Sequence, residues 1–141
     1  MKIEASLFLV AALAAAAVAQ ADPKAADPAG GRVFELRTYT ASPGKLDALN
    51  ARFRNHTVAL FKKHRMEVIA FWEPTDKEAG AGEKLVYLLA FPSRAAADAA
   101  WKEFRVDPEW IKVKAESETG GVLPAHIESV FMSPTDYSPL K

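Results

Sequence analysis

The stretches MEVIAFWEP at residues 66–74 and KLVYLLAF at residues 84–91 decide the fold of this chain. Both are rich in β-branched and aromatic residues, which predicts two β-strands. The loop at residues 76–83 is short and rich in Gly, Ala, Asp and Glu, so we expect an antiparallel pair. In both strands the residues of either face are apolar. A sheet with one face in water would alternate apolar and polar residues, so the sequence predicts that both faces are covered.

Another strand and a long helix precede this pair. Residues 33–40, VFELRTYT, end at Ser42-Pro43-Gly44, which predicts a strand and then a turn. Residues 43–64 repeat apolar side chains at helical spacing, which predicts an amphipathic helix. We expect Ser42 to be its N-cap, with Pro43 at the first helical position.

Two helices and a last strand follow the central pair. Residues 93–105 predict a helix with Ser93 as its N-cap, and a second helix is expected to start at Asp107 and Pro108. Residues 125–132, AHIESVFM, predict the final strand. The element order is β-α-β-β-α-α-β, which is close to the ferredoxin-like βαββαβ fold.

We therefore expect an α+β domain with a four-stranded antiparallel sheet in the spatial order 4-1-3-2. The helices suffice to cover one face of that sheet. Because the second face is apolar as well, it favours burial against another copy of the chain. The expected partner is a second copy, in a homodimer through the sheet faces.

The N-terminal 21 residues have the pattern of a signal peptide. Lys2 precedes an uninterrupted apolar run at residues 5–18, and A-x-A triplets end at Ala19 and at Ala21. The run is shorter than the roughly 20 apolar residues that span a bilayer. Cleavage after Ala19 or Ala21 is therefore favoured over an uncleaved membrane anchor.

Residues 22–32 are rich in Ala, Pro, Asp and Gly and have no periodicity, which is typical of a flexible leader. Residues 33–141 then form the expected domain. After signal cleavage we expect an exported protein without a stable membrane anchor, located in the periplasm of a bacterium or secreted from it.

Composition excludes several functional classes. The chain has 141 residues, with 18 Lys and Arg against 18 Asp and Glu, so its formal net charge is zero. Without a basic surplus, nucleic acid is not an expected partner. The chain has no cysteine, which excludes disulfides, thiolate catalysis and Cys-ligated metals. It also has no Gly-rich phosphate loop, no GxSxG motif and no Cys-linked haem motif, so no cofactor is expected.

Seven short motifs follow one another along the expected domain. They are FELRTYT at 34–40, PGKL at 43–46, HT at 56–57 with His64, FW at 71–72, AWKEFR at 100–105, DPEW at 107–110 and PTDYSPL at 134–140. Together they resemble the NIPSNAP family. The resemblance implies a homodimeric α+β barrel, in which the sheets of two ferredoxin-like subunits face each other. It also implies kinship of fold with small monooxygenases of antibiotic biosynthesis, but no agreed biochemical activity.

One residue departs from the family pattern. Arg65 follows His64 where the family commonly has Gly as the helix stop. A left-handed backbone at Arg65 would cost about 1 kcal/mol, so we expect this turn to close differently or the helix to extend slightly.

Glu35, Arg37 and Tyr39 share one face of a strand that is expected to be central. Two charges and a phenol are costly there unless they are paired. One hypothesis is that Arg37 and Tyr39 line a ligand pocket and orient an anionic or carbonyl group. The other is a paired Glu–Arg cluster at the dimer interface, which fixes the register of the two copies.

His56 and His64 are the candidate catalytic residues. On the expected helix, His56 falls at the edge of the apolar stripe and His64 near its centre, where an imidazole facing a cavity could act as a general base. The structural alternative is a half-buried His56 and a His64 that binds the last helical carbonyls. A metal site that includes His126 is a weaker alternative, because no HxxxH spacing is present.

Aromatic residues supply the other candidates for a ligand pocket: Trp72, Tyr87, Trp101 and Phe104. Trp101 and Phe104 are three positions apart on a helix and are expected to pack together against the sheet. Such a set usually forms core, but it could also form the walls of an apolar cavity for a small molecule.

Two functions from different classes remain open. The first is a dimeric barrel that binds a small apolar or aromatic molecule without turnover. The second is a cofactor-independent monooxygenase-like or isomerase-like enzyme, with a His base and Arg37 or Tyr39 as polar anchors. An inward-facing His in a cavity between helices and sheet would favour the enzyme, whereas Trp101 and Phe104 filling that space would favour binding.

Overall fold

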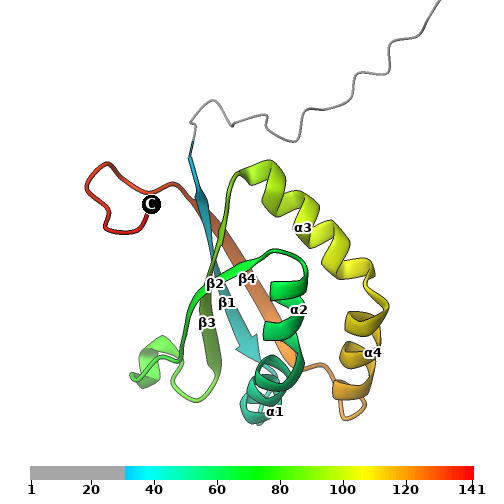
Figure 1. The fold of residues 1–141 in the computed structure, drawn as a ribbon. Helices are drawn as coiled ribbons and strands as arrows, with labels where there is room; N and C mark the ends of the chain where they lie inside the picture. Colours follow the sequence, from blue (N-terminus) through cyan, green and yellow to red (C-terminus); the bar gives the residue numbers. More distant parts are fainter. Residues whose placement is uncertain (1–30) are drawn as a thin grey trace, which may run out of the picture.

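The computed structural model describes residues 31–141. The expected signal peptide, and the leader up to residue 30, lie outside the described residues. Within residues 31–141, no helix is both long enough and apolar enough to cross a membrane. The described part has two layers, a twisted sheet and a set of helices packed on one side of it (Figure 1).

The sheet confirms the expected topology. Its four strands are β1 (Val33–Ala41), β2 (Glu67–Trp72), β3 (Lys84–Phe91) and β4 (Pro124–Met132). They pair antiparallel in the order β2-β3-β1-β4, which is the predicted 4-1-3-2 read from the other edge. In the middle of the sheet, Arg37 on β1 lies opposite Tyr87 on β3 and Ser129 on β4.

The helices after β3 begin where their caps predict. In α3 (Arg94–Val106) the Ser93 Oγ accepts a hydrogen bond from the Ala96 N–H at 3.1 Å. In α4 (Pro108–Ser117) Asp107 Oδ1 accepts from the Glu109 N–H at 2.8 Å, and Pro108 takes the first helical position. Both caps satisfy backbone donors that the first helical turn leaves free.

The first helix begins later than predicted. Its first segment is α1 (Leu46–Arg52), and no side chain caps it. Ser42 instead begins a turn, because its carbonyl oxygen accepts from the Lys45 N–H at 2.8 Å. Gly44 inside this turn has φ +71°, which is incompatible with a right-handed helix. The prediction that Ser42 and Pro43 start the helix was therefore wrong.

A π-helical turn interrupts this helix in its middle. The turn η1 (Phe53–Thr57) separates α1 from α2 (Val58–Lys63). A π turn contains one residue more than an α turn of the same height. The buried residues Leu49, Phe53 and Leu60 nevertheless lie on one stripe of the helix, which faces the sheet.

Arg65 adopts the left-handed conformation that its side chain disfavours. Its φ is +58°, and it closes α2 through hydrogen bonds from the Met66 N–H to the Phe61 carbonyl and from the Arg65 N–H to the Lys62 carbonyl. This is the Schellman arrangement, in which glycine usually occupies the position of Arg65. The turn therefore closes in the ordinary way with Arg65 in the strained position, and the expectation that it closes differently or that the helix extends was wrong.

The core lies between the helices and the sheet. Its largest fully buried apolar side chains are Tyr87, Phe61, Phe91, Leu49, Leu60 and Leu89. They come from α1, α2 and β3, so the first helix packs directly over the middle of the sheet. The helix-covered face of the sheet therefore carries most of the core packing.

The opposite face of the sheet is open to solvent over much of its area. By strand alternation and register it carries Leu36, Thr38, Val86, Leu88, Ala70, Trp72, Val130 and Met132, together with His126 and Glu128 on β4. Trp72 is 51% exposed and Val130 is 54% exposed. The C-terminal segment, residues 133–141, packs against one end of this face near Phe34 (Figure 1). We call it the uncovered face.

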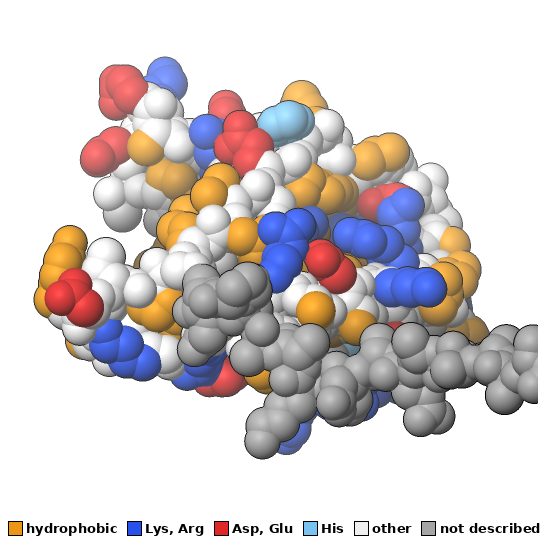
Figure 2. All heavy atoms as spheres, turned by 90° about the horizontal axis from the view of Figure 1, so that it is seen from above, with side chains coloured by type: hydrophobic (Ala, Val, Ile, Leu, Met, Phe, Trp, Pro, Cys, Tyr) orange, Lys and Arg blue, Asp and Glu red, His pale blue; other side chains and the backbone are white. Residues whose placement is uncertain are grey.

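Charged side chains are mixed on the surface. Figure 2 shows Lys and Arg side chains interspersed with acidic and apolar ones on the face seen from above. This pattern agrees with the zero net charge of the chain. The face seen there is therefore not a basic surface of the kind that binds nucleic acid.

Candidate functional site

Glu35 is buried on the helix-covered face of β1 and accepts hydrogen bonds from three side chains. Arg37 Nη1 and Ser129 Oγ each donate at 2.6 Å, and Trp101 Nε1 donates at 2.5 Å. These partners belong to β1, β4 and α3. Glu35 therefore joins the helix layer to two strands, in a site where its charge is fully hydrogen-bonded.

Arg37 lies between Glu35 and the aromatic side chains of the covered face. Its guanidinium carbon is 4.3 Å from the centre of the Trp101 ring, and Nη2 donates to the Tyr39 hydroxyl at 3.3 Å. Burial lowers the pKa of Arg37, but Tyr87, Tyr39 and Glu35 together raise it above its ordinary value. Among the residues that the structure describes, Nε of Arg37 has no hydrogen-bond partner.

The charges of β1 are paired as one of the two hypotheses requires, but at a different place. That hypothesis put the pair at the dimer interface. The structure puts Glu35 and Arg37 beneath α3 instead, because the indole N–H of Trp101 supplies a polar partner from the covering helix. The pair therefore faces away from the uncovered face and cannot set the register of two copies there.

Tyr87 is fully buried directly opposite Arg37. Burial, followed by the effect of Tyr39, raises the pKa of Tyr87 well above its usual value, so the hydroxyl stays protonated. This hydroxyl lies near Tyr39, yet it makes no hydrogen bond of good geometry within the described chain. A buried hydroxyl without a partner costs about 1–3 kcal/mol.

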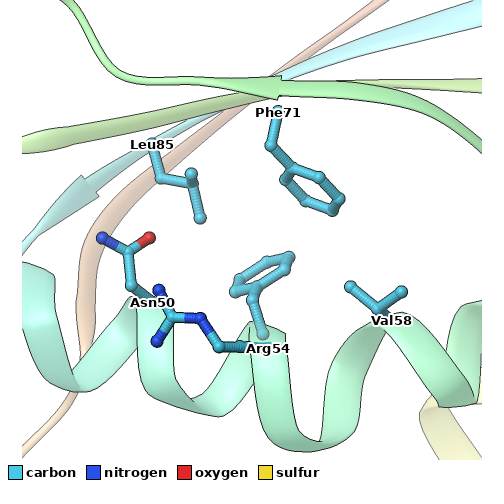
Figure 3. A pocket seen from close by; sticks show the side chains of 6 residues that line it. Asn50, Arg54, Val58, Phe71 and Leu85 are labelled. Carbon is cyan, nitrogen blue, oxygen red and sulfur yellow. The ribbon is translucent and has the colours of Figure 1, made fainter.

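A pocket of about 270 Å³ opens between the first helix and the β2–β3 hairpin. The residues that line it are Asn50, Phe53, Arg54, Val58, Phe71 and Leu85. Figure 3 shows Phe71 and Leu85 pointing from the strands towards the helix that carries Asn50, Arg54 and Val58. Asn50 Nδ2 donates to Glu73 Oε1 at 2.6 Å, which fixes the amide beside the pocket. An apolar lining with a few polar groups is typical of small-molecule sites.

A single layer of aromatic rings separates the pocket from Tyr87. The centroid of the Tyr87 ring is 5.2 Å from that of Phe53 and 5.4 Å from that of Phe71, and both phenylalanines line the pocket. Phe53 is the first residue of the π turn. The π turn therefore positions the side chain that separates the pocket from the buried polar residues.

None of the six residues expected to line a pocket lines this one. Arg37, Tyr39 and Tyr87 lie behind its wall, in the buried layer. Trp101 and Phe104 are buried as well and pack edge to face at 5.5 Å, so they fill the space beneath α3. Trp72 lies on the uncovered face, away from the helices.

His56 is exposed on the π turn and is not part of the pocket lining. The helical wheel that placed it at the edge of the apolar stripe assumed 3.6 residues per turn throughout. The buried residues Leu49, Phe53 and Leu60 still lie on one stripe of that wheel. The edge position of His56 therefore leaves its side chain exposed.

His64 is bound to the junction between α3 and α4. Its Nε2 lies 2.7 Å from Asp107 Oδ2, and its ring packs edge to face on Phe104 at 5.9 Å. Lys63 Nζ contacts the same Asp107 oxygen at 2.8 Å. Hydrogen bonds from Lys63, from His64 and from the Glu109 backbone hold the pKa of Asp107 well below its usual value. His64 thus joins two helix ends, a structural role that differs from binding its own helical carbonyls.

Metal ligands do not gather anywhere in the described part of the chain. Among residues 31–141, no group of three or more His, Cys, Asp or Glu side chains could hold a metal ion. His126 is exposed on β4 and its Nε2 lies 3.5 Å from Glu128 Oε1. The chemistry that the site offers is therefore apolar contact and hydrogen bonding.

Sequence reasoning missed the residues that line the pocket. Phe71 and Leu85 were assigned to the correct strands and treated as core. Asn50 and Arg54 of the first helix also flank the pocket, and neither was among the candidate site residues. The one usable signal was the pair of apolar strands at the sheet edge, which shows that apolar surface exists there but not that it is left unfilled.

Comparison with known proteins identifies relatives by family and by fold. The NIPSNAP family model matches residues 34–139. A search of curated proteins found no significant match. A solved NIPSNAP family protein from Agrobacterium tumefaciens is similar with a TM-score of 0.68 and 18% identity, over 78% of this chain and 99% of that chain. An uncharacterized NIPSNAP-like domain protein from Burkholderia xenovorans has a TM-score of 0.66 and 16% identity, over 77% and 90% of the two chains.

A more distant structural relative has a described activity. SnoaB, a cofactor-independent oxygenase from Streptomyces nogalater, has a TM-score of 0.50 and 14% identity, over 77% of this chain and 98% of that chain. At such identities the likeness establishes the ferredoxin-like α+β fold alone.

Proposed function

The chain belongs to the NIPSNAP family, and from this premise we propose that it is a dimeric barrel that binds a small apolar or aromatic molecule without turnover. The observation that carries the proposal is the pocket of about 270 Å³ beside the first helix. Phe53, Phe71 and Leu85 supply apolar contact surface, and Asn50 and Arg54 supply polar groups at one side. This combination suits a ligand that is mostly apolar and has a defined orientation.

The uncovered face supports the dimer. It exposes large apolar side chains such as Trp72 and Val130, which a soluble monomer rarely gathers on one surface. A second copy of the same face is the partner that matches it in shape and in chemistry, because an isologous interface pairs a patch with itself. In such a dimer the helix layers and their pockets lie on the outside.

A second candidate function is a cofactor-independent oxygenase-like enzyme. The fold likeness to SnoaB supports it. Against it, His56 is exposed and His64 is bound to Asp107, so neither imidazole faces the pocket. Trp101 and Phe104 fill the space in which a base would have to meet a substrate. Oxygen uptake with a small quinol, if it is lost in His64→Ala, would favour the enzyme over the binding protein.

We also propose that the domain acts after export, on the basis of the N-terminal signal pattern. Protein recovered from the periplasm should have the mass of a chain that begins after Ala19 or Ala21. A chain of full mass that stays in the cytoplasm would contradict export, and it would leave the binding proposal unaffected.

Toluene titration tests the binding function directly. Toluene is small and apolar, and its binding to the wild-type protein can be followed by calorimetry or by chemical shifts. Val58→Trp places a large ring at the pocket, so we expect toluene affinity to fall about tenfold or more. Ala59→Trp is the matched control, because Ala59 is exposed on the same helix and does not line the pocket.

The control variant should bind toluene within about twofold of the wild type. Absence of toluene binding to the wild type, or an equal loss in both tryptophan variants, would contradict the proposal. Native mass spectrometry of protein taken from its own cells then identifies the natural ligand as a mass that Val58→Trp loses.

A further inference from the structure

Two buried polar atoms on the covered face have no partner in the described chain. They are the Tyr87 hydroxyl and Nε of Arg37. The two residues lie directly opposite each other on β3 and β1, and both side chains point to the helix side. Opposite residues of an antiparallel pair have Cβ atoms about 5 Å apart. The unused donors therefore belong to one small region.

The hydroxyl of Tyr87 is unfavourable for folding alone. The ring packs among Phe53, Phe61 and Phe71, and a phenylalanine would keep each of these contacts. The oxygen atom adds the cost of a buried polar group that makes no hydrogen bond. Packing of the fold therefore accounts for the ring at this position and leaves the hydroxyl unexplained.

The pocket lies next to this region, and the Phe53 ring separates the two. Phe53 and Phe71 form part of its wall and contact the Tyr87 ring from the other side. Phe53 stands on the π turn, an irregularity that helices often have at functional sites. A ligand ring that takes the place of the Phe53 ring would lie against Tyr87 and bring its substituent to the unused donors.

We propose that the ligand is an aromatic molecule with a neutral oxygen substituent, whose oxygen accepts a hydrogen bond from the Tyr87 hydroxyl, with Nε of Arg37 as a second donor. This inference rests on the proposed binding function and adds the chemical class of the ligand. Phenols and quinone-type carbonyl compounds belong to this class.

The local charges explain why the oxygen is neutral. Arg37 is already paired with Glu35 at 2.6 Å, so the buried cluster has no net charge. A carboxylate brought into it would be an additional buried charge without a counterion, which is strongly unfavourable. Burial also keeps the Tyr87 pKa high, so its hydroxyl remains a donor across the physiological range.

The test compares toluene, p-cresol and p-toluate, which share one ring and one methyl group. In a purely apolar pocket p-cresol binds more weakly than toluene, because its hydroxyl loses water without gaining a partner. With Tyr87 as partner, we expect wild-type protein to bind p-cresol about tenfold more tightly than toluene. It should bind p-toluate more weakly than p-cresol.

Tyr87→Phe removes the donor and keeps the ring. We expect it to bind toluene within about twofold of the wild type and to lose the preference for p-cresol. Its thermal unfolding midpoint should be no lower than that of the wild type, which confirms that the variant is folded. Tyr137→Phe is the matched control, because Tyr137 is 84% exposed in the C-terminal segment.

The outcomes separate the two proposals. If toluene binds but p-cresol binds no better, or if Tyr87→Phe keeps the preference for p-cresol, the inference is overturned and the binding function stands. Tighter binding of p-toluate than of p-cresol would overturn the neutral class. If neither toluene nor p-cresol binds the wild type, the binding function and the inference are both wrong.

Discussion

The two faces of the sheet differ in what they bury and what they expose. The covered face buries an ion pair, Glu35 with Arg37, together with a tyrosine hydroxyl. The uncovered face exposes apolar side chains, among them Trp72 and Val130. The covered face also buries the apolar core, so the unusual feature is the apolar surface that the other face leaves exposed.

The two faces differ in what covers them within the chain. The covered face has its partner within the chain, because α3 supplies the Trp101 indole that completes the hydrogen bonding of Glu35. The uncovered face consists of alternating strand residues that no helix of the described chain reaches. The hydrogen bonding of Glu35 is thus complete in a single copy, whereas we propose that a second copy covers the other face. Each statement can be tested separately.

Removing the carboxylate at the centre of the covered face should have the largest effect. Glu35→Ala leaves Arg37 buried without its ion-pair partner and Trp101 without an acceptor. We expect unfolding free energy to fall by about 3–5 kcal/mol, measured by urea titration. Glu116→Ala, at an exposed position on α4, should change it by less than about 0.5 kcal/mol. Equal effects of the two changes would show that Glu35 does not hold the layers together.

A charge on the uncovered face should break the dimer without unfolding the protomer. Val130→Asp puts a carboxylate into the proposed interface twice, once from each copy, so we expect association to weaken about a hundredfold or more in sedimentation experiments. Ile111→Asp is a close control, because Val130 is 54% exposed and Ile111 on α4 is 55% exposed. A wild-type protein that sediments as a monomer at micromolar concentration would contradict the proposed dimer.

The attachment of the helix layer should weaken in acid. The folded pKa of Asp107 is depressed by Lys63, His64 and the Glu109 backbone, so Asp107 stabilises the fold above its unfolded pKa of about 3.9. That contribution is lost as the pH falls below this value and through the folded pKa. Asp107→Asn keeps an N-capping side chain and removes the charge.

The Asn variant should therefore have a lower urea midpoint than the wild type at pH 7. The difference should shrink steadily below about pH 4. A difference that does not depend on pH would mean that packing, rather than charge, makes Asp107 important.

Changing Arg65, in the turn between α2 and β2, should have the smallest effect. It should stabilise the protein rather than destabilise it. Arg65→Gly relieves the left-handed strain at φ +58°, so we expect a gain of about 0.5–1 kcal/mol in unfolding free energy. The ion pair with Glu103 that it removes is exposed and contributes little. Arg65→Ala loses the same ion pair but keeps a Cβ, so it should give no gain.

Strand positions, strand order and the later helix caps could be predicted from the sequence because they depend on local patterns. KLVYLLAF has strand residues at each position and lies at β3 as expected. Ser93 and Asp107 cap the helices that follow them, since capping depends on a side chain and a backbone group a few residues apart. Once the strand order was known, strand alternation showed which residues share each face of the sheet.

The candidate site could not be predicted, because it depends on contacts between distant residues. Trp101 lies 66 positions after Glu35, and their hydrogen bond has no sequence signature. The polar side of β1 was therefore assigned equally well to a pocket or to a dimer interface. The helical wheel placed His56 at the edge of the apolar stripe, and in the structure that edge is exposed.

The π turn at Phe53–Thr57 also affects how relatives of this chain should be aligned. Such a turn is equivalent to the insertion of one residue into an α-helix. A relative with an uninterrupted helix would match this chain before and after the turn only if one gap is placed within it. An ungapped alignment would shift the residues on one side of the turn by one position, which is about 100° around the helix. Comparative studies of the pocket should therefore begin with the length of this segment.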